Sequence, residues 1–78
     1  MKAVHKGKYT QLGLKIGYYR KLKHLSQEQL AQAINKSLAF IGAVEAPNVD
    51  RAISLDTLFD IADELEVPVF KFFEFEAE

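Results

Sequence analysis

The chain has 78 residues, the length of one small domain near the lower limit for an unassisted hydrophobic core. It contains no cysteine, which excludes disulfides and thiolate metal sites, and its two histidines, His5 and His24, are too few and too far apart for a zinc site. With 49% apolar and 27% charged residues, it has the composition of a folded protein, and we expect it to bind no metal and no cofactor.

The charges are divided unevenly between the two halves of the sequence. Residues 1–36 carry eight Lys and Arg against one Glu, a formal charge of +7, whereas residues 37–78 carry two against ten Asp and Glu, a charge of −8. The first half can therefore present a positive field although the net charge is −1. Two solvated faces that only maintain solubility would give the same pattern, so the asymmetry supports nucleic-acid binding only beside a docking element.

The start of the chain, MKAVHKGKYTQ, has lysines with no apolar segment behind them, which is unlike a signal peptide. No apolar run approaches the ~20 residues that span a bilayer. We interpret residues 1–8 as a flexible basic arm, and we expect a cytoplasmic protein without membrane contact.

A first helix is predicted over residues 10–23, because Leu12, Ile16 and Tyr19 form an apolar stripe at i, i+4 and i+7. Two glycines in this stretch each weaken an isolated helix by roughly 1 kcal/mol relative to alanine. Packing against other helices must therefore hold the segment in place.

Residues 26–45, SQEQLAQAINKSLAFIGAVE, have the spacing of two short helices joined by a tight turn. Ser26 and Gln29 form an S-x-x-Q capping box, which marks the start of a helix predicted over residues 27–34. Asn35 stands where the chain must reverse, and asparagine is one of the few residues that accept a left-handed backbone there.

The second helix of this pair is predicted over residues 37–45. The apolar positions on the two helices are Leu30, Ala31, Ile34, Ile41 and Val44. Ala31 is small where the helices would cross closely. Such a helix-turn-helix can hold one helix away from the body of the domain, positioned to enter a DNA major groove.

Proline and an N-cap residue divide the rest of the chain. The segment 46–48, Ala-Pro-Asn, ends the third helix, because the residue before a proline is pushed out of the helical region. Ser54 is the expected N-cap of a fourth helix, SLDTLFDIADEL. Its expected buried face comprises Leu55, Leu58, Phe59, Ala62 and Leu65. Pro68 suits the first turn of a short fifth helix, VFKFFEF.

These elements predict an all-α fold of five helices, with a domain over residues 9–75 and an acidic tail at 76–78. An enzyme is not expected, because no Ser/His/acid or Cys/His set and no complete phosphate-binding loop is present. The acids of the fourth helix are interpreted as the solvated face of an amphipathic helix rather than as a metal or general-acid cluster. These acids are Asp56, Asp60, Asp63 and Glu64.

Three segments, LGLKIGYYRKLKHLSQEQLAQAI, IGAVE and SLDTLFDIADELEVPVFKFF, resemble the lambda-repressor-like (Cro/XRE-type) helix-turn-helix family over about residues 11–73. The motif LSQEQLA is among the more specific signatures of so small a fold. The resemblance implies a five-helix, lambda-repressor-like DNA-binding domain that regulates transcription as a repressor. It also implies a structural ion pair between Arg20 and Glu45, which would fix the third helix to the body of the domain.

The same resemblance implies the contacts with double-stranded DNA. Gln27 matches a position whose side chain and backbone amide hold a phosphate, although a solvated first-turn residue is the alternative. Lys36 would make a screened phosphate contact, and Ser37 would cap the third helix and also touch DNA. Asn48 and Arg51, in the loop after that helix, match positions that touch the DNA backbone.

The positions that would read bases are Leu38, Ala39, Phe40 and Ala43, where the family usually has side chains that form bidentate hydrogen bonds. Each such pair supplies roughly 1–3 kcal/mol of discrimination, so we expect phosphate contacts and DNA shape to carry much of the binding, with thymine methyls adding selectivity. Lys36 also occupies a site that is usually apolar. As alternatives to base contact, Leu38 or Phe40 would fold back into the core or form a protein-binding patch. The alternative function is a protein-binding module that uses the apolar third helix without specific DNA recognition.

The C-terminal run VPVFKFFEFEAE has more apolar side chains than one helical face can bury in so small a domain. The resemblance implies that Phe72 and Phe73 close the core, which leaves Phe70 and Phe75 as candidates for a homodimer interface or as incidentally exposed residues. A dimer would place two third helices about one DNA turn (~34 Å) apart and bind a palindrome more tightly.

Overall fold

The computed structural model describes residues 2–49 and 51–75, so the predicted acidic tail at 76–78 lies outside the described residues. The helical segments, in chain order, are η1 (Ala3–His5), α1 (Lys6–Leu22), α2 (Gln27–Ala33), α3 (Leu38–Glu45), α4 (Leu55–Leu65) and η2 (Val69–Phe73). No strand occurs within these ranges. The all-α prediction is confirmed, with the difference that the fifth helix is a 3-10 helix.

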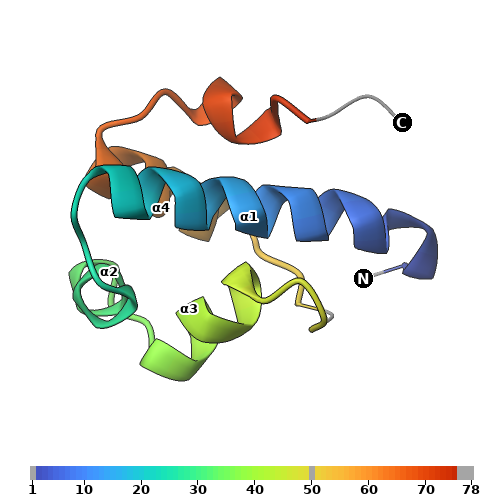
Figure 1. The fold of residues 1–78 in the computed structure, drawn as a ribbon, viewed down its shortest axis with the longest axis horizontal. Coiled ribbons are helices and arrows are strands. Elements are labelled where there is room, and N and C mark those ends of the chain that lie inside the picture. Colours follow the sequence, from blue (N-terminus) through green and yellow to red (C-terminus); the bar gives the residue numbers. More distant parts are fainter. Residues whose placement is uncertain (1, 50, 76–78) are drawn as a thin grey trace.

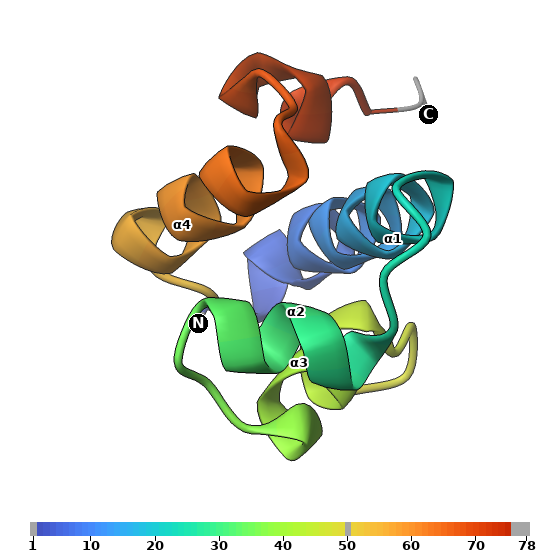
Figure 2. The ribbon, with the colours of Figure 1, turned by 90° about the vertical axis from the view of Figure 1, so that its left-hand side faces the viewer.

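Helix α1 forms the centre of the domain, with α2 and α3 on one side of it and η2 on the other (Figure 1). The view turned by 90° shows α4 beside α1, with η2 above both (Figure 2). Side chains from every α-helix and from η2 meet in one core. Its largest fully buried members are Phe72, Ile16, Leu30, Ile41, Leu58, Ile61 and Leu65. Burying each of them contributes roughly 1.5–3 kcal/mol, which holds together helices too short to be stable alone.

Helix α1 begins four residues earlier than predicted, so Lys6, Gly7 and Lys8 form its first turn rather than part of a flexible arm. The sequence lacks a capping side chain there, and a 3-10 turn supplies the start instead: the backbone N–H of His5 donates to the carbonyl of Lys2 (3.0 Å). Lys6 and Lys8 are compatible with this extension, because lysine is a good helix former. The domain limits at residues 9 and 75 stay predictions.

Local capping signals match the structure closely. The Ser26 hydroxyl accepts from the N–H of Gln29 (3.0 Å), and the Gln29 side chain accepts from the N–H of Ser26 (2.8 Å), which completes the capping box. Asn35 is left-handed, with a φ of 58°. Ser54 caps α4 by accepting from the N–H of Thr57 (3.1 Å). Helices α2 and α4 therefore begin where the sequence predicts.

The predicted buried face of α4 is partly wrong. Leu58, Ala62 and Leu65 are buried, but Leu55 is 61% exposed and Phe59 46% exposed. Ile61 is buried as well, so the buried stripe runs through residues 58, 61, 62 and 65. Successive residues are 100° apart around the helix axis, which places Leu55 and Phe59 at the edge of this stripe.

The prediction that Phe72 and Phe73 close the core is also only half correct. Phe72 is fully buried, and its ring meets that of Tyr19 edge to face at 5.4 Å between centroids. Phe73 is 47% exposed. A tight 3-10 turn points successive side chains in different directions, so it can bury only one of the two.

Candidate nucleic-acid interface

Helix α3 crosses α1 at very short range, and two glycines of α1 allow the approach. A Cβ atom built on Gly13 would collide with the backbone carbonyl oxygen of Val44 in α3. A Cβ on Gly17 would lie 3.1 Å from Oε1 of Glu45. The absence of a side chain at position 13 is therefore a condition for docking α3 against α1.

A buried ion pair fixes the end of α3 to α1. The Nε of Arg20 donates to Oε2 of Glu45 (2.7 Å) and its Nη2 donates to Oε1 (2.8 Å), as the resemblance implies. The third guanidinium nitrogen, Nη1, donates to the backbone carbonyl of Leu25 (2.7 Å). Both charged side chains are only 8% exposed. The hydrogen bond to Glu45 raises the pKa of Arg20 above its ordinary value, so the guanidinium stays charged.

Glu45 also holds Gln27, the first residue of α2. The side-chain nitrogen of Gln27 donates to Oε1 of Glu45 (3.1 Å), and Gln27 is half-buried. A carboxylate that accepts from both Arg20 and Gln27 ties α1, α2 and α3 together. The Gln27 side chain is thus held in place beside the first turn of α2, rather than solvated on all sides.

The N-terminal end of α3 faces solvent. Ser37 caps the helix by accepting from the N–H of Phe40 (3.0 Å). Lys36, Ser37 and Ala39 are exposed, and Leu38 is 50% exposed, whereas Ala43 is half-buried. The first turn of α3 is therefore open to a partner of either kind, nucleic acid or protein.

Phe40 differs from the other positions expected to read bases, because it is partly buried and packs against the core. Two cations lie near its ring: Nζ of Lys36 at 5.5 Å from the ring centroid and Cζ of Arg51 at 4.9 Å. Arg51 and Asn48 are exposed in the loop that follows α3. The structure thus gathers Lys36, Phe40 and Arg51 into one cluster, which nothing in the sequence indicated because the loop path was unknown.

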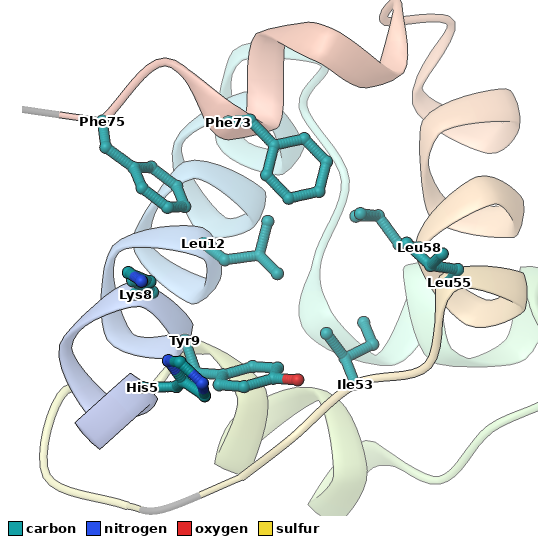
Figure 3. A pocket seen from close by; sticks show the side chains of 9 residues that line it. All are labelled: His5, Lys8, Tyr9, Leu12, Ile53, Leu55, Leu58, Phe73 and Phe75. Atoms are coloured by element: carbon teal, nitrogen blue, oxygen red, sulfur yellow. The ribbon is translucent and has the colours of Figure 1, made fainter. Parts of the chain in front are cut away.

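The residues expected at a dimer interface lie apart from α3. Phe73 and Phe75 both line an apolar hollow of about 370 Å³ between α1, α4 and the C-terminal segment, residues 69–75 (Figure 3). The centroids of their two rings lie 6.1 Å apart. Phe70 lies outside this hollow and is 59% exposed. Phe70 and Phe75 both belong to the C-terminal segment, which lies across α1 from α3 (Figure 1).

Neither a cluster of possible metal ligands nor a membrane-spanning helix is found in the part of the chain that is described. There, no group of three or more His, Cys, Asp or Glu could hold a metal ion. Within the same residues, no helix is long and apolar enough to cross a membrane.

Comparisons with known proteins agree with this geometry. A family model described as helix-turn-helix matches residues 16–72. Among solved structures, the restriction-modification controller protein C.AhdI from Aeromonas hydrophila is similar, with a TM-score of 0.77 and 27% identity over 85% of this chain and 97% of that chain. No curated protein matches the chain. The family match supports DNA binding in the regulation of transcription. Because the family model spans most of the chain, the protein belongs to the Cro/C1-type helix-turn-helix family.

Proposed function

We propose that the protein binds a specific site on double-stranded DNA with α3 in the major groove and represses transcription from that site. The observation that carries the proposal is the solvent-facing first turn of α3, which is flanked by Lys36 and Arg51 and fixed to α1 by Arg20 and Glu45. A rigid, exposed helix beside cations has the shape and charge that a DNA groove requires.

The proposed phosphate contacts surround α3. Gln27 offers the N-terminal end of α2, where free N–H groups favour an anion. Lys36 and Ser37 precede α3, and Asn48 and Arg51 follow it, so backbone contacts on both sides would set the depth and register of the helix in the groove.

The proposed base contacts are apolar. Leu38, Ala39 and Ala43 cannot form bidentate hydrogen bonds, but they can pack against thymine methyl groups. Selectivity would then come from these methyls and from sequence-dependent DNA shape, which favours A/T-rich sites. Phe40 is the residue of this set least suited to base contact, because it is partly buried against the core.

Salt titration of duplex binding tests the proposal against the alternative of a protein-binding module. We expect log K to fall steeply with log[salt]. The slope of this plot should be about −0.9 for each phosphate that the protein neutralises. Lys36→Ala should flatten this slope by about that amount per subunit. Lys71→Ala is the matched control, because Lys71 lies on η2 beside Glu74 (3.9 Å), and its slope should be unchanged. Absence of duplex binding, or binding that salt does not weaken, would favour a protein partner.

We further propose that the protein acts as a homodimer through its C-terminal segment, in the cytoplasm. Phe70 is 59% exposed, and Phe75 is half-buried and lines the apolar hollow, so a second copy could cover both. Sedimentation at micromolar concentration should give twice the 8.8 kDa mass of one chain. A single monomeric species there would contradict the dimer without affecting the DNA-binding proposal.

A further inference from the structure

We propose that Phe40 is a positioning residue: its ring holds Lys36 and Arg51 together as one clamp for the DNA backbone at the N-terminal end of α3. The inference rests on the proposed DNA binding and assigns Phe40 a different role from base reading. The cluster of Lys36, Phe40 and Arg51 is called the α3 clamp below.

The ring is held firmly enough to act as a platform. Its side chain packs against the hydrophobic core, and its backbone N–H donates to the Ser37 hydroxyl (3.0 Å) at the cap of α3. Both ends of the residue are thus fixed by contacts within the domain. A side chain anchored in this way cannot also extend into the groove to reach a base edge.

The two cations come from different segments. Lys36 precedes α3 and Arg51 lies in the loop after it, yet they approach the same ring to 5.5 Å and 4.9 Å from its centroid. Both distances are within the range of cation–π attraction. Both side chains are exposed, and among the described residues no carboxylate forms an ion pair with either one. Without the ring, each would move among many rotamers.

The chemistry of the α3 clamp favours a phosphodiester. Two positive charges gathered around one ring repel each other, and an anion placed between or beside them relieves that repulsion. The aromatic ring attracts cations but cannot neutralise them, so the clamp keeps its positive charge. Ordering the two side chains before binding also lowers the entropy lost when DNA arrives.

A double-mutant cycle on duplex affinity tests the clamp. Phe40→Leu keeps an apolar side chain but removes the ring, and it should weaken binding roughly two- to tenfold for each cation that must then be ordered on binding. The double substitution Lys36→Ala and Arg51→Ala should also weaken duplex binding. This loss of affinity should be much smaller in the Phe40→Leu background than in the wild-type background. Phe40→Tyr keeps the ring and should bind like the wild type.

Two controls make the outcome specific. Phe59→Leu removes a half-exposed ring on α4, outside the clamp, and should leave duplex affinity unchanged. Thermal unfolding verifies that each variant is folded, and Phe40→Met provides a second ring-free variant if the leucine does not fold.

The outcomes separate the clamp from DNA binding itself. If the wild type binds no duplex, the proposed function fails and the clamp fails with it. If the wild type binds with a steep salt dependence but the two cation substitutions cost the same with and without the ring, only the clamp is overturned.

Discussion

Gly13→Ala is expected to destabilise the domain by about 3 kcal/mol, because overpacking usually costs about 1–3 kcal/mol. This loss should outweigh the gain from alanine being the better helix former. The added Cβ would meet the carbonyl oxygen of Val44, a backbone atom that cannot rotate away as a side chain can. Relief requires α1 and α3 to move apart, which disturbs the core between them. Chemical denaturation measures the change.

Gly7→Ala is the matched control, because it lies in the same helix with nothing within 4 Å of the new Cβ. This substitution should stabilise the domain, by up to about 1 kcal/mol. The two substitutions are chemically identical. Changes of opposite sign in the free energy of unfolding would therefore locate the effect at the crossing of α1 and α3. A Gly13→Ala variant as stable as the wild type would show that the helices do not cross so closely.

Arg20→Met is expected to cost about 3–5 kcal/mol, because it leaves the carboxylate of Glu45 buried without its partner. A domain of this size has a total stability of about 4–12 kcal/mol, so the loss is a large part of it, and the melting temperature of the variant should fall by more than about 10 °C. Lys71→Ala breaks an exposed pair with Glu74 and should change stability little. Thermal and urea unfolding measure both.

Removing both charges should cost less than removing one. The double variant Arg20→Met with Glu45→Leu leaves no unpaired buried charge and should recover much of the stability lost by Arg20→Met. Since the folded-state pKa of Arg20 is raised, its contribution is fully present below the ordinary arginine pKa and is lost only at more alkaline pH. A double variant no more stable than the single one would contradict this explanation.

The parts of the fold that the sequence predicted well are set by local interactions. Ser26, Asn35 and Ser54 each act within four residues of their own position, through a capping hydrogen bond or a left-handed backbone. Leu55 and Phe59 were wrongly assigned to the core, because the buried sector of α4 depends on how other helices pack against it. Periodicity alone does not determine that sector.

The candidate site shows the same division. The Arg20–Glu45 pair followed from the family resemblance, since 25 residues separate the two and nothing local links them. The glycines of α1 predicted only a weak helix, and the reason for Gly13 became visible once α3 was placed against it. The α3 clamp depends on the path of the loop that carries Arg51, which the sequence does not determine.

Backbone amide shifts of the labelled protein, recorded as a DNA duplex is added, test most directly whether α3 and its flanking cations form the DNA-binding surface. We expect the largest changes at residues 26–28 and 36–43 and at Asn48 and Arg51, with little change at Asp60 and Asp63 on the exposed face of α4. Changes centred on α4, or an unaffected α3 in the presence of saturating duplex, would contradict the account.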